Sequence, residues 1–392
     1  MNGIDDLIDA LCPDGVEFRK LGDLVEYEQP TKYLVESTQY SDAYETPVLT
    51  AGKTFVLGHT DEKDGIYGAS PSNPVIIFDD FTTAFRWIEF PFKVKSSAMK
   101  MLRPRDQVTA NFRYVYYAMS SIGFQPQEHS RHWISRYSAF RIPVPPLEVQ
   151  REIVETLDKF VHLEAELEAE LLARRRFNAY HMNKLLSFDG EDVDRVPLGE
   201  LGELVRGRRF TKSDYVDAGG IGSIHYAELY THFGTSADSV PHRINSEMEP
   251  RMRFAHPGDV VIAEVGETVE EVGKAMAWLG DEKVAVHDGC FVLSHSLNPV
   301  FVSYCLQTTT YHAQKARYVS RAKLKRLRFD GIKKLAIPVP PRATQDRLVE
   351  ILETLDALIC DPSNGIPAEI SARRNQYEFY RDRLLNFEEL AT

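Results

Sequence analysis

Residues able to do chemistry are scattered along the chain, and they form no complete catalytic or metal-binding set. Gly52-Lys53-Thr54 ends like a phosphate-binding loop, but Pro47 stands where that motif requires its first glycine, so a hairpin turn is the better interpretation. His129 and His132 have a spacing that could hold a metal on a helix, yet no cysteine or third histidine lies nearby in the sequence. His287-Asp288 has no partner nucleophile. We therefore expect a non-catalytic chain without a metal site.

Two further patterns could belong to DNA-modifying enzymes. Asn298-Pro299-Val300-Phe301 resembles the N-P-P-Y/F motif of amino-methyltransferases, with a valine in place of the second proline. No glycine-rich cofactor loop accompanies it, and a helix N-cap followed by proline explains the same residues. Asp79-Asp80, and Asp259 with Glu264, lack the lysine that follows the carboxylates of a nuclease site, so we interpret them as strand-end carboxylates. A modifying enzyme with an unrecognised site remains an alternative.

Basic residues interleaved with aromatic ones give the clearest indication of a ligand. The chain has a formal net charge of −12, but nine basic residues and one acidic residue, Asp330, lie between Lys315 and Lys334. Lysine and arginine neutralise DNA phosphates, and arginine also donates to guanine edges. We therefore predict double-stranded DNA as a partner, although a merely solvated surface is the simpler alternative. The predicted DNA-binding residues are Lys53, Lys63, Arg86, Arg131, His132, Arg206, Arg208, Arg209, Lys212, Lys315, Arg317, Arg321, Lys323, Lys325 and Arg326.

The elements that must position these residues are organised by a repeat. One stretch of sequence begins with I-P-V-P-P at Ile142 and ends with L-L-S-F at Phe188, and a second begins with I-P-V-P-P at Ile337 and ends with L-L-N-F at Phe387. The copies also share Gln150 and Gln345, Leu157-Asp158 and Leu355-Asp356, and Arg174-Arg175 and Arg373-Arg374. A repeat of this length indicates a duplicated architectural unit.

Each copy predicts a long helix after its prolines. In the first copy, apolar residues from Ile153 to Leu171 recur at the helical period, and neither Pro nor Gly interrupts Leu147 to Ser187. In the second copy, the helix should be interrupted near residues 361–366 by Pro362 and Gly365. A helix of this length needs a partner along it, and the other copy is the obvious one.

The regions outside the two helices are rich in strand signals. We predict an α+β fold in which two strand-rich domains, residues 1–141 and 191–336, alternate with two long antiparallel coiled-coil helices, residues 142–190 and 337–392, in a pseudo-two-fold internal repeat. Strands are expected in Pro47–Gly58, Asn73–Phe81, Arg86–Val94, Gly258–Val265 and Val284–Val286, and short helices at the N-terminus, at Asn111–Met119 and from Asn298 to Gln307. Apart from their ends, the two regions align poorly.

Composition favours a cytoplasmic protein. The four cysteines are far apart and lack metal-ligand spacing, which suits reduced thiols. The N-terminus has neither the basic start nor the apolar centre of a signal peptide, and no apolar run is long enough to span a membrane.

The order of parts resembles the specificity subunit of type I restriction–modification systems. The resemblance rests on both I-P-V-P-P and L-L-x-F motifs, on Q-R-E-I-V-E-T-L-D-K-F at Gln150–Phe160 and on the stretch Ala368–Phe387, so it covers essentially the whole chain. It implies that each variable region is a target recognition domain reading one half of a bipartite DNA sequence. It also implies that the two helices hold these domains apart and dock two modification subunits, which carry the methyltransferase chemistry.

The same resemblance implies the remaining partners and cofactors. Restriction subunits with translocase and nuclease functions join the complex, while S-adenosylmethionine, Mg²⁺ and ATP belong to partner subunits and not to this chain. As residues that dock partner subunits we select Leu157, Phe160, Leu167, Leu171, Leu352 and Leu355. A coiled-coil scaffold that binds only protein remains an alternative.

Overall fold

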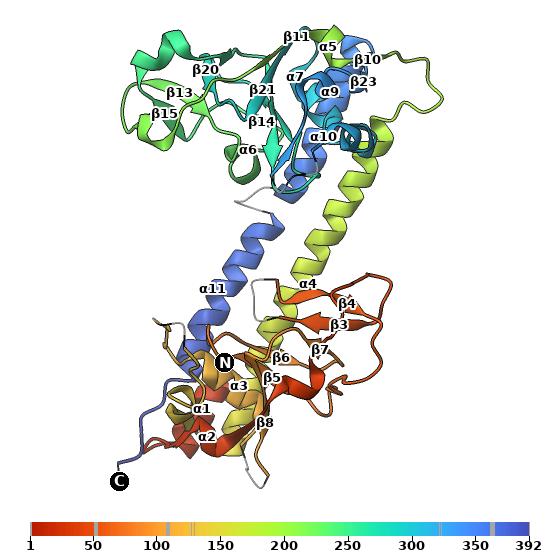
Figure 1. Cartoon of the computed structure of the whole chain (residues 1–392). Coiled ribbons are helices and arrows are strands. Elements are labelled where there is room, and N and C mark those ends of the chain that lie inside the picture. The colour runs from red at the N-terminus through yellow and green to blue at the C-terminus, as the bar shows by residue number, and fades with distance from the viewer. Residues whose placement is uncertain are drawn as a thin grey trace. The chain divides into compact units, whose positions relative to one another are not determined.

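A computed structural model of the chain describes residues 2–50, 54–106, 110–126, 128, 130–320, 322, 324–360 and 365–391. The chain divides into two compact units, which we describe separately. Unit 1 comprises Met1–Leu167 with Ile370–Thr392, and unit 2 comprises Glu168–Glu369. Helix α4 (Leu147–Leu185) begins in unit 1 and ends in unit 2 (Figure 1). The predicted α+β class, with strand-rich parts on either side of a long helix in the sequence, is confirmed.

Unit 1 consists of short strands and helices, followed by the first part of α4 and most of the last helix. Its elements are α1 (Asn2–Leu11), β1 (Glu17–Lys20), α2 (Leu21–Leu24), β2 (Val25–Glu28), η1 (Pro30–Tyr33), β3 (Thr46–Leu49), β4 (Val56–Thr60), β5 (Val75–Asp79), β6 (Phe85–Ile88), β7 (Lys93–Val94), β8 (Met99–Pro104), α3 (Phe112–Ser120), η2 (Tyr137–Ala139), β9 (Arg141–Val144) and α11 (Ile366–Leu384). The larger sheet has the order β2-β8-β5-β6, and a smaller one has the order β4-β3-β7. Strand β1 pairs antiparallel with β9, so both ends of the first variable region meet.

The main core of unit 1 joins this larger sheet to α3 and to the start of α4. Ile76 and Leu102 from the sheet, Tyr114 from α3 and Ile153 and Leu157 from α4 are all buried in it. The apolar residues of α4 recur at helical spacing, which places them on one face of the helix. Burial of each such side chain stabilises the fold by about 1.5–3 kcal/mol.

Unit 2 contains the second variable region. Its elements are β10 (Arg195–Pro197), α5 (Leu198–Leu201), β11 (Gly202–Arg206), η3 (Lys212–Asp214), β12 (Tyr215–Val216), β13 (Ile221–Ile224), α6 (Glu228–Thr231), β14 (Ser236–Ala237), β15 (His242–Ile244), η4 (Ser246–Arg251), β16 (Phe254–Ala255), β17 (Val260–Ala263), β18 (Val265–Gly266), β19 (Ala275–Trp278), β20 (Val284–Val286), β21 (Cys290–His295), α7 (Pro299–Cys305), α8 (Thr309–Lys315), η5 (Ala316–Tyr318), β22 (Lys325–Arg326), α9 (Phe329–Ile332), β23 (Ala336–Pro338) and α10 (Arg342–Cys360). The sheets have the orders β11-β21-β17-β19-β14 and β12-β15-β13-β20-β16.

The two units repeat one antiparallel sheet. The order β11-β21-β17-β19 in unit 2 matches β2-β8-β5-β6 in unit 1. At equivalent places, the backbone N–H of His132 donates to Asp80 O and that of Leu327 donates to Glu264 O, at 2.8 Å in both cases. His132 and Leu327 are separated along the chain by the same distance as the two I-P-V-P-P motifs. The repeat therefore includes the variable regions, whose sequences alone align poorly.

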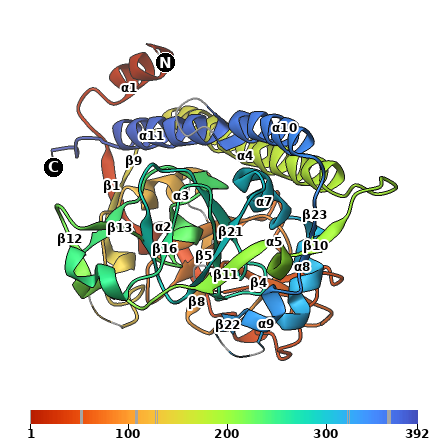
Figure 2. The same ribbon diagram turned by 90° about the horizontal axis from the view of Figure 1, so that it is seen from above.

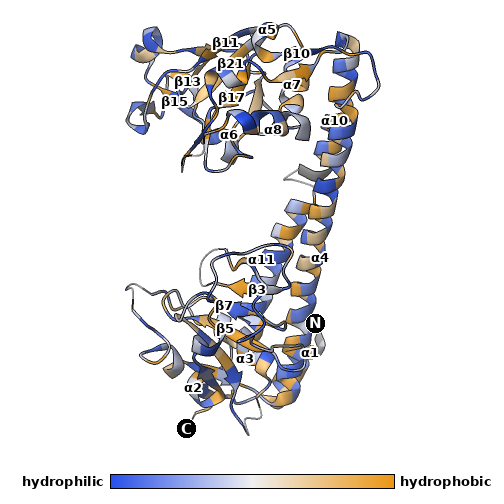
Figure 3. Ribbon diagram, turned by 45° about the vertical axis from the view of Figure 1, so that its right-hand side comes forward, coloured by the Kyte–Doolittle hydropathy of each residue, from blue (hydrophilic) through white to orange (hydrophobic). Residues whose placement is uncertain are grey.

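The long helices lie at the predicted positions in the chain where the structure describes them. Helix α4 is continuous, as expected. The expected interruption of the second helix falls mostly on residues 361–364, which lie outside the described residues; α10 ends at Cys360 and α11 begins at Ile366. The ribbon of α4 alternates between hydrophobic and hydrophilic colours along its length (Figure 3). Among the described residues, no helix combines the length and apolar composition needed to cross a membrane.

Within each unit, α4 packs against the second repeat helix. In unit 1, the Phe160 ring stacks on Tyr380 with centroids 5.4 Å apart, and Glu164 accepts an ion-paired hydrogen bond from Arg374. Phe160 precedes Glu164 in α4, whereas the partner of Phe160 follows the partner of Glu164 in α11, so the two helices are antiparallel there. In unit 2, Asn178 Nδ2 of α4 donates to the carbonyl of Leu355 in α10 at 2.8 Å.

One predicted strand is wrong in its extent. Arg86–Val94 was expected to alternate as a single strand, whereas β6 ends at Ile88 and β7 begins at Lys93 in a different sheet. Pro91 lies between them and has no backbone N–H to continue a ladder of hydrogen bonds.

Candidate nucleic-acid interface

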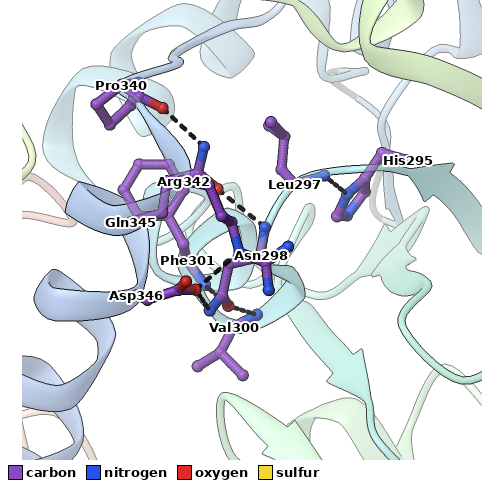
Figure 4. A network of polar contacts seen from close by, with 9 residues as sticks. All are labelled: His295, Leu297, Asn298, Val300, Phe301, Pro340, Arg342, Gln345 and Asp346. Carbon is purple, nitrogen blue, oxygen red and sulfur yellow. Dashed lines mark hydrogen bonds and ion pairs between the residues drawn. The ribbon is translucent and has the colours of Figure 1, made fainter.

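The glutamine of each repeat attaches a strand-rich region to its long helix. In unit 2, Gln345 Oε1 accepts from the backbone N–H of Asn298 at 2.9 Å, and Gln345 Nε2 donates to Pro340 O at 2.8 Å (Figure 4). The Asn298 side chain caps α7 by accepting from its first free backbone N–H groups. It also donates to Asp346 Oδ1 at 2.7 Å. One amide side chain thus ties the start of α7 to the start of α10.

Unit 1 has the same arrangement. Gln150 Oε1 accepts from Asn111 N–H at 2.8 Å, Gln150 Nε2 donates to Pro145 O at 2.7 Å, and Asn111 caps α3. The predicted N-cap at Asn298 is therefore confirmed, and its amide is engaged in capping and in binding Asp346. Among the described residues, no group of three or more His, Cys, Asp or Glu could hold a metal ion, and His129 lies outside those residues.

Most of the predicted DNA-binding residues of unit 2 are exposed. Arg206 ends β11, and the exposed Arg208 and Arg209 follow it. Three further residues are exposed: Lys212 in η3, Arg317 in η5 and Arg326 in β22. Lys325, also in β22, is partly buried. Strand β22 and helix α9 follow one another at one side of unit 2 (Figure 2). Strand β18 begins directly after Glu264, which follows the end of β17, and it pairs with β22. Arg326 of β22 and Arg206 at the end of β11 bind the same carboxylate, so the basic run of the sequence lies next to the end of β11.

A buried carboxylate joins two of these arginines. The Glu264 side chain is 0% exposed; it pairs with Arg206 through Nε at 2.7 Å and Nη2 at 2.8 Å, and with Arg326 through Nη1 at 3.0 Å. Burial raises the pKa of the Glu264 carboxyl, and the two guanidinium groups act in the opposite direction. The arginine side chains are 45% and 53% exposed. Two cations share one carboxylate, so the group keeps a net positive charge at the surface.

Sequence reasoning described Glu264 as a strand-end carboxylate, which is correct, but missed its arginine partners. Arg206 and Arg326 lie 58 and 62 positions away in the sequence. No local spacing rule connects residues at such separations. The sequence signal for this cluster was weak: Glu264 lies at the end of a predicted strand, and Arg206 and Arg326 lie in basic runs.

The predicted DNA-binding residues of unit 1 are more dispersed. Lys63 is exposed after β4, and Arg86 on β6 places its guanidinium 4.7 Å from the ring centroid of Phe55. Arg131 is exposed in the segment before η2. Lys53 lies outside the described residues, as do Arg321 and Lys323 of unit 2.

Two predicted DNA contacts are wrong because their side chains are buried. Lys315 is 0% exposed, and its ammonium donates to the carbonyls of Glu270, at 2.8 Å, and Val272. Burial lowers the pKa of Lys315 to about 8. His132 is 3% exposed, and its ring packs edge-on against Phe124. Neither side chain can reach a DNA phosphate from these positions.

The predicted subunit-docking residues need a similar correction. Leu157 and Leu352 are buried in the cores of their own units at 0% and 2% exposure, so they are not available to another protein. Phe160, Leu167, Leu171 and Leu355 are partly buried. Large apolar side chains that the prediction missed are exposed on the same helices: Val161, Leu163, Leu172, Phe177, Tyr180, Ile351 and Phe379.

Similarity to known proteins extends over nearly the whole chain. The family model described as type I restriction modification DNA specificity domain matches residues 13–174 and 190–372. The specificity subunit of a type I restriction enzyme of Escherichia coli is 36% identical, over 99% of this chain and 97% of that protein. A putative type I restriction enzyme specificity subunit of Haemophilus influenzae is 27% identical, over 71% of this chain and 72% of its own length.

Solved structures share the fold. The S subunit of a type I restriction–modification system from M. genitalium superposes with a TM-score of 0.50 at 14% identity, covering 95% of this chain and 96% of that one. A chain from a structure that addresses complex assembly and conformational transition of a type I restriction–modification system gives a TM-score of 0.57 at 16% identity, covering 96% and 98%. At these identities the likeness concerns the fold.

Proposed function

We propose a DNA-contact surface for this chain, which belongs to the family of type I restriction–modification DNA specificity subunits. The exposed basic residues around Glu264 make the DNA contacts of its second target recognition domain. The chain supplies DNA sequence specificity to a restriction–modification complex through two such domains. The observation that carries the proposal is the pairing of Arg206 and Arg326 with one carboxylate, which leaves positive charge at the surface of an acidic protein.

The surrounding residues supply contacts that do not depend on sequence. Arg208, Arg209 and Lys212 are exposed and follow β11, the strand that Arg206 ends. Arg317 is exposed in η5, ahead of β22, the strand that contains Arg326. A protein that neutralises DNA phosphates releases condensed counterions, so its affinity falls steeply with salt. Phosphate contacts of this kind set the position of the protein on the duplex, whereas base contacts determine the sequence.

We assign the recognition domains to residues 1–141 and 191–336 and the helical parts to residues 142–190 and 337–392. Each recognition domain reads one half of a bipartite target. The chain itself performs no catalysis and binds no cofactor, because its sequence lacks a glycine-rich cofactor loop and a nuclease carboxylate–lysine set. S-adenosylmethionine, Mg²⁺ and ATP act on partner subunits. Methyl transfer or DNA cleavage by the purified chain alone would contradict this assignment.

The partners are two modification subunits, together with restriction subunits that join the same complex. In unit 2, the exposed apolar residues of α4 are Leu172, Phe177 and Tyr180, at 50%, 57% and 63% exposure. In unit 1, Val161 and Leu163 are exposed on the same helix. Aromatic residues are enriched at protein–protein interfaces relative to the rest of the surface. We assign one modification subunit to each of these groups.

The DNA assignment is tested on the complex with its modification subunits. Arg208, Arg209, Lys212 and Arg317 are replaced together by Ala, and the affinity for an unrelated duplex is measured against salt concentration. The slope of log K against log salt should fall by up to about 0.9 for each lost phosphate contact. Lys184→Ala, which removes an exposed charge from α4, is the control and should leave the slope unchanged. An unchanged slope in the fourfold variant, with the complex intact, would refute the assignment.

A further inference from the structure

The two units place a buried carboxylate at equivalent positions but pair it with different cations. Asp80 follows β5 and Glu264 follows β17, the corresponding strand of the repeated sheet. The backbone N–H of Asp80 donates to Ala98 O and that of Glu264 to Gly289 O, in each case to the residue just before the neighbouring strand. Asp80 is 1% exposed and Glu264 is 0% exposed. The carboxylate is thus a shared feature of the fold.

In unit 1 this carboxylate has a purely internal environment. Lys100 Nζ lies 3.2 Å from Asp80 Oδ2, and the side chains of the pair are 1% and 2% exposed. The backbone N–H of Trp133 donates to Asp80 Oδ1 at 2.8 Å. Lys100 also lies 4.8 Å from the ring centroid of Tyr27. These contacts stabilise the fold and present no charge to a ligand.

In unit 2 the cations instead face solvent. About half of each arginine side chain, Arg206 and Arg326, is exposed although both pair with the buried Glu264. A guanidinium has five N–H donors, and the pairing with Glu264 uses only some of them. The Phe291 ring lies 5.6 Å from the Arg206 guanidinium, and the N–H of Leu327 donates to Glu264 O at 2.8 Å. The Glu264 carboxylate therefore holds both guanidinium groups, the Phe291 ring supports that of Arg206, and the Leu327 bond fixes the backbone next to Arg326.

We infer that Glu264 is a positioning residue for sequence readout, which holds Arg206 and Arg326 so that their remaining N–H groups contact guanine edges in the half-site read by unit 2. This inference rests on the proposed function. Arginine donating to O6 and N7 of guanine is the commonest specific protein–DNA contact, and it requires a fixed orientation of the fork. Glu264 supplies that orientation and offsets the repulsion between two neighbouring guanidinium groups. A fold-stabilising pair alone would need neither arginine at the surface, as Asp80 and Lys100 demonstrate.

The test uses the complex with modification subunits and three variants. Arg206→Lys and Arg326→Lys keep the charge and remove the fork, and Glu264→Gln keeps the shape and removes the negative charge. Affinities are measured for the target duplex and for an unrelated duplex, and methylated sites are mapped by sequencing. Each Lys variant should weaken target binding about 5- to 150-fold, the discrimination provided by one bidentate arginine–guanine pair, and leave unrelated DNA within about twofold. Glu264→Gln should lower target affinity while affinity for unrelated DNA stays equal or increases.

The mapped sequence gives the sharpest readout. The variants should relax one or two positions in a single half-site and leave the other half-site unchanged. Arg243→Lys is the matched control, because Arg243 lies on β15 of unit 2, its side chain is 43% exposed, and its Nη2 donates to the Gly220 carbonyl at 3.0 Å. It should change neither affinity nor the mapped sequence.

Two results would overturn the inference. Equal losses for target and unrelated DNA in the Lys variants would show that these arginines contact phosphates only. An unchanged target affinity and an unchanged mapped sequence, with a lower melting temperature, would show that the cluster is structural. Failure of the proposed function can be told apart from failure of this inference. It would appear as an unchanged salt slope in the fourfold Ala variant, which leaves Arg206, Arg326 and Glu264 in place.

Discussion

The hydroxyl of Tyr304 in α7 donates to Asp356 Oδ2 in α10 at 2.7 Å. In unit 1 the hydroxyl of Tyr117 in α3 donates in the same way to Asp158 in α4. Asp158 and Asp356 are the acidic residues of the L-D step that the two repeat copies share. The shared aspartate therefore has a definite task in both units, which is to bind a tyrosine of the short helix that packs on the long one.

Tyr304→Phe should destabilise unit 2 because it removes this bond and keeps the ring. A hydrogen bond to a charged group contributes about 1.5–3 kcal/mol to stability, so the free energy of unfolding should fall by about that amount. Burial and the Asp356 carboxylate both raise the pKa of Tyr304, so the hydroxyl stays protonated and the effect should not vary between pH 6 and about 9. Urea denaturation measures the change. Tyr180→Phe, at a 63% exposed site, should cost less than about 0.5 kcal/mol.

Gln345→Ala should loosen the start of α7 from the start of α10. The substitution leaves the Asn298 N–H and the Pro340 carbonyl without their partner, at a cost of about 1–3 kcal/mol for each buried group left unpaired. Gln345→Glu keeps the acceptor for Asn298 but places a buried carboxylate oxygen against the Pro340 carbonyl, so its cost in stability should be at least as large. Hydrogen exchange at the Asn298 amide separates the two, since only the Ala variant should speed it strongly. Equal exchange in both variants would contradict the assigned role of Oε1.

Lys315 should make the stability of unit 2 depend on pH. Its pKa is lowered by burial from 10.5 to about 8, so between these values the unfolded chain binds more protons than the folded one. Stability should therefore rise with pH in this window, by at most about 1.4 kcal/mol per pH unit. Lys315→Met should remove the rise measured by urea denaturation from pH 8 to 10. It should leave the salt slope of DNA binding unchanged, because the ammonium binds carbonyls inside the protein.

The sequence predicted the regular elements better than the site, for identifiable reasons. The period of apolar residues gave α4, and capping chemistry gave the start of α7 at Asn298, because both rules are local. A basic run does not reveal which of its members faces inward, so Lys315 was grouped with its exposed neighbours. The cluster of Glu264, Arg206 and Arg326 depends on strand pairing between distant segments, which no local pattern encodes. The repeat of the sheet was not visible in the sequence either, because strand interiors tolerate many different apolar residues.

Phe177 and Tyr180 should be needed for assembly with a modification subunit. Replacing both by Ser should leave the chain folded, because the side chains are 57% and 63% exposed, and should weaken its binding to the modification subunit. Losses of about 2 kcal/mol or more are typical of aromatic residues at the centre of an interface. Size-exclusion chromatography with light scattering gives the stoichiometry. The conservative Phe177→Tyr should retain assembly, and full assembly of the double Ser variant would exclude this surface.

The length of α4 should set the gap between the two half-sites. Duplicating Glu166-Leu167-Glu168-Ala169, between Phe160 and Leu171, adds four residues, or about 6 Å of helix, and nearly preserves the helical face. Duplex DNA rises about 3.4 Å per base pair, so the gap should grow by one or two base pairs. Both half-sites should keep their bases, because the recognition domains are unchanged. Inserting two residues instead turns the later part of the helix by about 200° and should abolish activity. Methylation mapping reads the spacing directly, and an active four-residue variant that still methylates the original spacing would show that α4 does not set it.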